Sequence, residues 1–373
     1  MTIPKPNTHP DVAKNQHLVP QTYMKAWSYN GGNSVWVYDK KRLEEGLESA
    51  DEETIWKIES RSIERINAIT NFYDMKAGDI YLSEDALEEI YGFLKGYDIS
   101  FEGENLDTYE KLNQHYFDID NWEIKKPDGT TVFRRQRNLI KQNLQQTRYT
   151  FIETNWSSQY ENEWESFIND IEERVRIKKK LLPGKAYLRS QDMEKLMKYF
   201  IMFDWRSEEG NFLVNDIIER LVNIISPDEI EIPEEERSHK EDSTILKEFK
   251  HNFARKAYYE YLNDKGTMAT YMKSYLQNMS FVFLLTDSTC PFITSERPAM
   301  VIDSEDGLKE HILVATPTLL VSTGKTDNPN KFRSIKLSKE GVLRYNRQIA
   351  KNSESLILTS DTFKIKQLFE YRF

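Results

Sequence analysis

The chain has 373 residues and a formal net charge of −10 at pH 7, with 39% hydrophobic and 30% charged residues. This length supplies a large core, and 20 Tyr, 19 Phe and 7 Trp provide buried area that disordered chains lack, so disorder of the whole chain is excluded. The acidic balance, averaged over the surface, opposes nonspecific attraction to nucleic acid.

Cysteine content and hydropathy indicate the compartment. Cys290 is the sole cysteine, so an intramolecular disulfide is impossible and a reducing cytoplasm is the expected location. The polar N-terminal stretch lacks the apolar core of a signal peptide. Since no apolar run approaches the ~18 residues of a membrane span, we also expect no association with a membrane.

The N-terminal third alternates turn residues with short periodic segments. A polar, disordered tail is expected over 1–16, followed by a short helix over 18–27 and, after a glycine turn, a strand over 34–38. Ser83 has the character of an N-cap, because two acids and an apolar helical stripe follow it. Turn residues in the middle of 122–133 predict a small hairpin.

The middle third is predicted to be helical because apolar residues recur there at three and four positions. The expected helices cover 134–146, 160–175, 196–203, 212–225, 245–262 and 268–276. An acidic, proline-containing stretch at 227–242 is the best candidate for an exposed linker. This linker lies in a possible helical middle subdomain, 134–278, within one domain that spans 17–373.

The last hundred residues contain short β-rich runs. Strands are expected at 279–285, 312–315 and 319–322, and helices at 342–352 and 362–369. The predicted fold class is therefore α+β, predominantly helical, with a small mixed sheet mainly in the C-terminal third.

Basic residues concentrate between 121 and 150, a segment that contains seven Lys or Arg and two Asp or Glu and so has a local charge of +5. Phe133 lies among them, and cations interleaved with aromatic rings are typical of surfaces that bind nucleic acid. We therefore assign Arg134, Arg137 and Lys141 as candidate nucleic-acid-binding residues. The alternative is an ordinary solvated helix face.

Established catalytic motifs are missing. The six histidines include no pair at i, i+4, the cysteine count excludes cysteine-based zinc sites, and there is neither a glycine-rich phosphate loop nor a serine elbow. The strand-like fragment Glu123-Ile124-Lys125 is weakly nuclease-like. Its partner aspartate would have to come from Asp107, Asp118 or Asp120, which lack strand patterns, so we favour a structural hairpin and predict no metal site.

Several short segments, taken in order, carry a family resemblance. They read QHLVPQTYMK at 16–25, NFY at 71–73, DWRS at 204–207, FITSERP at 292–298, and YN at 345–346. The chain resembles an uncharacterised, mainly bacterial family, number four-two-three-eight of the domains of unknown function. Glu296 and Arg297 depart from the aspartate and asparagine usual there, which puts a strict metal-ligand role in doubt.

The resemblance implies a set of polar residues but no established chemistry. We expect them to share one pocket, with the helix carrying His17 packed against the segment carrying Ser295. The candidate catalytic residues are His17 as general acid or base, Glu296, Arg206 as an anion clamp, and Ser295; the candidate substrate-binding residues are Gln21, Asn71 and Asn346. The alternative is a buried polar network without a substrate.

Two function classes follow. One is a bacterial or phage accessory protein of a defence kind, as the resemblance suggests, with nuclease-like hydrolysis of nucleic acid or of a phosphorylated substrate. Mg²⁺ or Mn²⁺ would be the cofactors to test. The other is a non-catalytic binding or regulatory module that uses the basic segment or the polar pocket. The substrate and the oligomeric state do not follow from the sequence.

Overall fold

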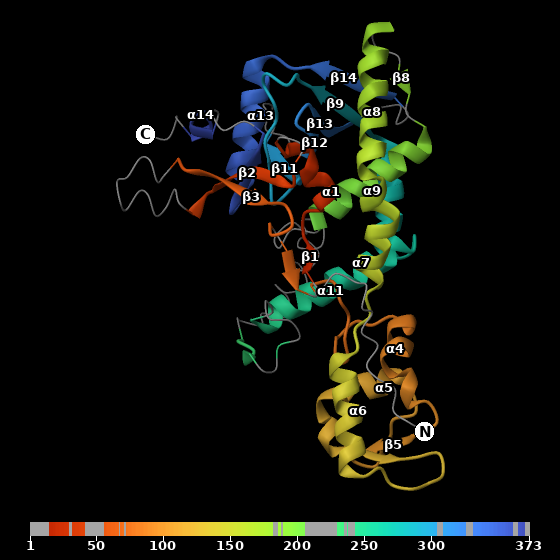
Figure 1. Cartoon of the computed structure of the whole chain (residues 1–373). Coiled ribbons are helices and arrows are strands. Elements are labelled where there is room, and N and C mark those ends of the chain that lie inside the picture. The colour runs from red at the N-terminus through yellow and green to blue at the C-terminus, as the bar shows by residue number, and fades with distance from the viewer. Residues whose placement is uncertain are drawn as a thin grey trace. The chain divides into compact units, whose positions relative to one another are not determined.

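A computed structural model provides the structure, shown in Figure 1. It describes residues 15–29, 32–41, 56–66, 68–70, 72–181, 186–187, 189–205, 230–234, 237, 243–303, 309–325, 331–360 and 365–369. The chain divides into two compact units built from interleaved segments. Unit 1 comprises Met1–Gln16, Thr70–Trp156 and Leu213–Met268, and unit 2 comprises His17–Ile69, Ser157–Phe212 and Ala269–Phe373.

Unit 1 combines helices with a three-stranded antiparallel sheet of order β6-β5-β7. Figure 1 shows α4, α5, α6 and β5 close together. The elements are α4 (Glu84–Tyr91), η2 (Gly92–Leu94), β5 (Asp98–Phe101), β6 (Glu104–Asn105), α5 (Tyr109–Gln114), η3 (Tyr116–Asn121), β7 (Glu123–Lys125), α6 (Arg134–Gln146), α7 (Phe151–Trp156) and α11 (Ile245–Leu262).

Local sequence explains several of these elements. The Ser83 hydroxyl accepts a hydrogen bond from the Ala86 amide and begins α4. The turn after β7 closes through a bond from the Lys126 amide to the Thr130 carbonyl at 2.8 Å, with Gly129 at a φ of 79°. The N-cap at Ser83, the turn and the helix at 134–146 are therefore confirmed.

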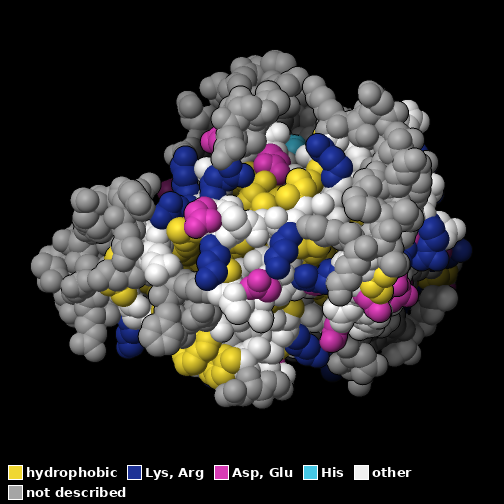
Figure 2. Space-filling model, turned by 90° about the horizontal axis from the view of Figure 1, so that it is seen from above, with side chains coloured by type: hydrophobic (Ala, Val, Ile, Leu, Met, Phe, Trp, Pro, Cys, Tyr) yellow, Lys and Arg dark blue, Asp and Glu magenta, His cyan; other side chains and the backbone are white. Residues whose placement is uncertain are grey.

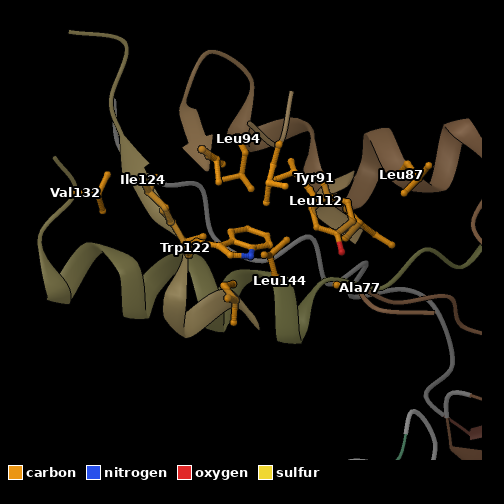
Figure 3. Packing of buried hydrophobic residues seen from close by; sticks show 14 residues of the cluster. Ala77, Leu87, Tyr91, Leu94, Leu112, Trp122, Ile124, Val132 and Leu144 are labelled. Atoms are coloured by element: carbon orange, nitrogen blue, oxygen red, sulfur yellow. The ribbon is translucent and has the colours of Figure 1, made fainter. Parts of the chain in front are cut away.

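The core of unit 1 is a cluster of buried apolar residues from α4, the sheet and α6 (Figure 3). Trp122 is fully buried at its centre, and its indole N–H donates to the His115 carbonyl at 2.9 Å. Ala77, Ile119 and Leu144 belong to the same cluster. Those three side chains also form the floor of a cavity described below.

Unit 2 contains two sheets. The four-stranded sheet has the order β10-β15-β2-β3 and is antiparallel; the six-stranded sheet has the order β11-β12-β13-β9-β14-β8, in which β14 runs parallel to β9. The elements are α1 (Gln21–Met24), η1 (Lys25–Trp27), β2 (Ser34–Asp39), β3 (Ile58–Ser62), η4, a π-helix (Ser157–Glu161), α8 (Asn162–Leu181), β8 (Ala186–Tyr187), α9 (Ser190–Trp205), β9 (Met279–Leu285), β10 (Thr294–Ser295), β11 (Ala299–Asp303), β12 (Lys309–Thr316), β13 (Leu319–Lys325), β14 (Lys331–Lys336), α13 (Lys339–Asn352), β15 (Leu356–Thr359) and α14 (Ile365–Phe369).

Three further elements lie where the chain passes from one unit to the other. They are β1 (Asn15–His17) and β4 (Ala68–Thr70), which pair as a two-stranded sheet, and α12 (Gly266–Asn278).

The predicted fold class is wrong in its sheet component, because sheets occur throughout the chain instead of one small sheet mainly in the C-terminal third. The missed strands, such as β3 and β5, have only five and four residues and few apolar side chains. A period of two is not detectable over so few positions. Their pairing with distant partners stabilises them.

The remaining expected helices and strands are partly confirmed. Residues 18–27 contain only the short α1 and η1, because Pro20 stands as the N-cap of α1 and 15–17 form a strand. The helix over 245–262 and the strands at 279–285, 312–315 and 319–322 are confirmed. The expected helix over 212–225, the tail up to residue 14 and most of the linker 227–242 lie outside the described residues.

Candidate anion-binding site

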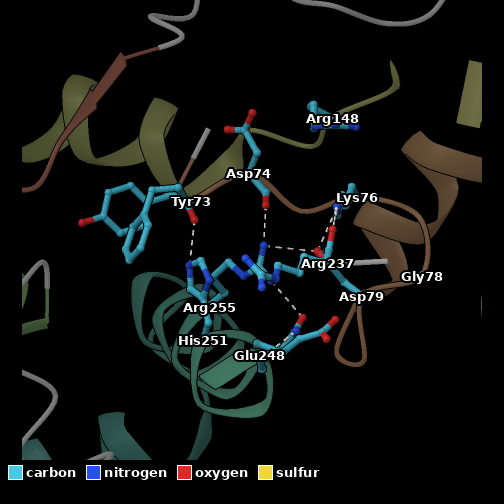
Figure 4. Close-up of polar contacts among 12 residues, drawn as sticks. Tyr73, Asp74, Lys76, Gly78, Asp79, Arg148, Arg237, Glu248, His251 and Arg255 are labelled. Atoms are coloured by element: carbon cyan, nitrogen blue, oxygen red, sulfur yellow. Dashed lines mark hydrogen bonds and ion pairs between the residues drawn. The ribbon is translucent and has the colours of Figure 1, made fainter. Parts of the chain in front are cut away.

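The segment 73–79 of unit 1 is fixed by buried hydrogen bonds (Figure 4). Gln16 is fully buried; its amide nitrogen donates to the Asp74 carboxylate at 2.5 Å, and its amide oxygen accepts from the Tyr73 backbone at 2.6 Å. Burial raises the pKa of Asp74, while the bond from Gln16 opposes the rise. Because both polar ends of Gln16 are used, the residue determines the path of the chain at 73–74.

A buried ion pair continues this network. Arg255 on α11 lies 3.2 Å from the Asp79 carboxylate, and both side chains are 1% exposed. The same guanidinium donates to the Asp74 carbonyl at 2.6 Å and to the Asn252 side chain at 3.0 Å. Several hydrogen bonds therefore compensate the desolvation of the charges.

The tip of the loop packs against η3. The Gly78 amide donates to the Asn113 side chain at 2.8 Å, and Asn113 donates in turn to the Asp79 carbonyl at 2.9 Å. Gly78 has a φ of +89°, and a Cβ atom there would lie 2.6 Å from the Tyr116 ring and 3.0 Å from that of Phe117. Only glycine fits this conformation and this close approach.

A backbone bridge brings two cations together. Met75 and Tyr149 exchange hydrogen bonds of 3.0 and 2.9 Å. Their neighbours in the sequence, Lys76 and Arg148, are thereby placed beside each other (Figure 4). Burial lowers the pKa of Lys76, Asp79 opposes that change, and Arg148 adds to it.

These residues surround a cavity of about 440 Å³. Ala77, Ile119 and Leu144 form its apolar floor, and Tyr116 and Phe117 contribute aromatic rings. The volume lies within the range of roughly 300–1,000 Å³ that is usual for small-molecule sites. Phe117 is 66% exposed, so its ring face is open to a ligand.

The polar lining is cationic. Lys76, Lys141, Arg148 and Arg237 line the cavity together with Gln145, and no Asp or Glu is among the described lining residues. Figure 2 shows one face of the molecule on which Lys and Arg are interspersed with Asp and Glu. Four cations without a lining carboxylate repel one another, and a bound anion would relieve this repulsion.

The cations retain donors for such an anion. Arg148 uses one terminal nitrogen, Nη1, for bonds to the Gln145 and Thr147 carbonyls at 2.6 and 3.0 Å. Lys141 forms an ion pair of 2.6 Å with Asp120, which is exposed outside the lining. An ammonium has three N–H donors and a guanidinium five, so both groups have donors left.

Comparison with protein families identifies the relatives of the chain. A family model described as "Protein of unknown function (DUF4238)" matches residues 15–363. The chain belongs to this family. No curated protein and no solved structure matches it. Within the DUF4238 chain, no helix of the described part is long and apolar enough to cross a membrane.

The sequence-predicted polar residues are distributed over several local networks. His17 in β1 contacts the Glu64 carbonyl at 3.1 Å and the Gln21 amide at 3.3 Å. The helix α1 that follows it reaches the segment of Ser295: the buried Tyr23 hydroxyl contacts the Thr294 hydroxyl at 2.6 Å. Among the contacts described for His17, none joins it to Ser295, Glu296 or Asn346.

Those three C-terminal candidates hold backbone segments. Glu296 accepts hydrogen bonds from the amides of Glu354, Ser355 and Leu356, at 2.5, 3.3 and 2.9 Å. Asn346 accepts from the Ile293 amide at 3.1 Å and donates to the Pro291 carbonyl at 3.0 Å. The buried Ser295 hydroxyl bonds to the Arg297 backbone at 3.0 and 3.1 Å. All of these hydrogen bonds join a side chain to backbone groups.

Two candidates, Asn71 and Arg206, lie outside the described residues. Asp204, two residues before Arg206 in the DWRS segment, lies on α9. Burial raises the pKa of Asp204 to about 8, and the charge of Arg297 opposes this shift. Two family-like segments are thus close in space in unit 2.

Arg134, Arg137 and Lys141 lie on α6. Arg137 and Lys141 both contact Asp120, through its carbonyl at 3.2 Å and its carboxylate at 2.6 Å, so they share one helix face. Arg134 is exposed at the start of the same helix. Lys141 alone of these three lines the cavity.

The nuclease-like fragment is on a strand, as expected, with Glu123 and Lys125 exposed. An aspartate on the neighbouring strand that the sequence did not indicate is Asp98, which pairs with Lys125 in the β5–β7 register. Within the described ranges, no group of three His, Cys, Asp or Glu residues is placed to hold a metal ion.

Sequence reasoning missed Gln16, Lys76, Arg237 and Arg255. Arg148 was counted in the basic segment but not assigned a role. Lys76 is the sole Lys or Arg between Arg65 and Lys95, and 71 residues lie between it and Arg148, so periodicity and charge runs cannot detect the pair. The family-like segments at 16–25 and 71–73 could have indicated the buried network, because they contain Gln16 and Tyr73.

Proposed function

We propose that unit 1 of this DUF4238 protein is a binding module for a phosphorylated ligand, acting in the cytoplasm. The observation that supports it is the cavity of about 440 Å³ lined by four cations, with no Asp or Glu among its described lining residues. In a chain of net charge −10, such a cavity concentrates positive potential at one place.

Each lining side chain would contact a part of the ligand that suits its chemistry. Arg148 offers a planar guanidinium suited to two oxygens of one phosphate. Lys76 and Lys141 add point charges, and the bridge between Met75 and Tyr149 fixes Lys76 next to Arg148. The apolar floor and the Phe117 ring would contact the uncharged part of the ligand.

A binding role is preferred to hydrolysis because the described lining contains cations, aromatic rings and an amide, and neither a carboxylate nor an imidazole. Imidazoles and carboxylates are the commonest general acids and bases, and the lysine and arginine side chains of this lining are suited to donating hydrogen bonds to the oxygens of an anion. The network behind the cavity, with Asp79 paired to Arg255, is structural in its contacts.

The test is calorimetric titration of the full chain with inorganic phosphate, pyrophosphate and nucleoside mono-, di- and triphosphates. Lys76→Met and Arg148→Met should each weaken binding by about 10–100-fold, because a hydrogen bond to a charged group contributes about 1.5–3 kcal/mol. Arg148→Lys should recover only part of the affinity, since it keeps the charge but loses the planar fork.

The matched control is Lys111→Met. Lys111 is a lysine of the same unit that pairs with Asp107 and Glu104 and does not line the cavity. Its removal should leave affinity unchanged. The proposal fails if none of these anions binds, or if the Lys111 variant loses as much affinity as the two cavity variants. Products formed in the presence of Mg²⁺ or Mn²⁺ would instead support the hydrolase.

A further inference from the structure

We infer that the ligand of this cavity is a single-stranded nucleic acid that inserts its terminal phosphate, an inference that rests on the proposed phosphate binding. The cavity alone would suit a free nucleotide. Three features of the surface beside it favour a strand: a line of cations on α6, two exposed aromatic rings, and a closed floor.

The cations continue out of the cavity along one helix. Arg134, Arg137 and Lys141 are spaced i, i+3, i+7, and Asp120 contacts fix the last two on a common face. At 1.5 Å per residue, Arg134 and Lys141 are about 10 Å apart along the axis, which corresponds to about three nucleotides of a stacked strand. A mononucleotide in the cavity would leave Arg134 unused.

The aromatic rings are the most exposed large apolar side chains of the described residues. Phe117 lines the cavity and is 66% exposed, and Phe133 precedes Arg134 and is 73% exposed, with the Lys126 ammonium 5.9 Å from its ring. Exposed rings beside cations are the platforms on which bases of single strands stack, each worth about 1–3 kcal/mol.

The floor determines which part of the strand enters. Ala77, Ile119 and Leu144 are at most 3% exposed and belong to the core, so a strand cannot leave through the bottom of the cavity. A terminal phosphate monoester carries about −1.5 to −2 charges at pH 7, more than an internal diester. Four converging cations favour the more highly charged end.

The experiment is fluorescence anisotropy with the full chain and labelled 12-mers of DNA and RNA. The arms are 5′-phosphate, 3′-phosphate and unphosphorylated single strands and a blunt duplex, with an unlabelled mononucleotide as competitor. We expect one phosphorylated end to bind at least tenfold more tightly than the hydroxyl end, and the duplex more weakly than that strand.

Variants separate the two parts of the site. Phe133→Ala and Arg134→Ala should each weaken binding of the phosphorylated strand several-fold and leave the affinity for a mononucleotide unchanged. Arg134→Ala should also reduce the slope of log affinity against log salt concentration by about 1. Arg148→Met should weaken binding of both the strand and the mononucleotide. Melting curves verify that each variant is folded.

The outcomes are distinct. If mononucleotides bind but the strands show no preference for a phosphorylated end, or if the Phe133 and Arg134 variants bind like the wild type, this inference is overturned and the proposed function stands. If no phosphate compound binds in any arm, the proposed function is overturned with it.

Discussion

The backbones of Met75 and Tyr149 form an antiparallel bridge with hydrogen bonds of 3.0 and 2.9 Å. Through it, Lys76 and Arg148 become neighbours, although 71 positions separate them in the chain. The bridge involves main-chain atoms, so a substitution at Met75 or Tyr149 other than to proline keeps its donors and acceptors. The bridge therefore holds the backbones of two cavity-lining cations at adjacent positions.

Gly78→Ala should both destabilise unit 1 and weaken phosphate binding. A methyl group there would lie 2.6 Å from Tyr116 and 3.0 Å from Phe117, at a φ of +89°. We expect a loss of about 1–3 kcal/mol from the backbone alone, plus displacement of two cavity-lining rings. Gly103→Ala is the control, because it has a φ of +84° with nothing within 4 Å. Equal affinities in the two variants would contradict the predicted role of the contact.

Gln16→Ala should lower the free energy of unfolding by about 1–3 kcal/mol, because it leaves the Tyr73 amide and the Asp74 carboxylate without this partner. Chemical denaturation measures the change. Gln21→Ala removes only a part-buried contact of 3.3 Å and should have an effect below about 0.5 kcal/mol. A larger loss for Gln21 than for Gln16 would reverse our assignment of the two glutamines.

Asp204 gives a pH prediction. Its folded pKa of about 8 lies above the ordinary value of 3.8, so between these pH values the native state retains a proton that the unfolded chain releases. This contribution to stability therefore decreases as pH rises from about 4 to 8, by at most about 1.4 kcal/mol per unit. Asp204→Asn should be more stable than the wild type at pH 8, with a difference that vanishes near pH 4. A difference independent of pH would contradict the assignment.

Asn346→Ala should destabilise unit 2 by about 1–3 kcal/mol, since the Ile293 amide and the Pro291 carbonyl lose their partner. Phosphate binding by the folded protein should not change. Asn352→Ala, which removes one bond to the Gln348 carbonyl on the same helix, is the matched control and should have a smaller effect. Loss of phosphate binding in folded Asn346→Ala would contradict this prediction and would support a role of Asn346 in ligand binding.

Local chemistry determined what could be predicted from the sequence. Helix α6 and the N-cap at Ser83 depend on neighbouring residues, and the sequence located both. Strands such as β5 depend on partners elsewhere in the chain, and their existence was mostly missed. For the site, the basic segment indicated Lys141, whereas the approach of Lys76 to Arg148 follows from tertiary pairing. The family-like segments singled out His17, yet Gln16 beside it has the buried contacts.

The order in which unit 1 is assembled from its segments constrains its synthesis. Asp79 lies in the second of its three segments and Arg255 in the third, so their ion pair cannot form until residue 255 has left the ribosome. At 5–20 residues per second, translation of the 176 residues from Asp79 to Arg255 takes about 9–35 s. During this interval the apolar cluster of 77–144 is already synthesised while Asp79 still lacks Arg255, so slowing the ribosome before residue 255 should prolong the time for which this carboxylate is without its buried partner.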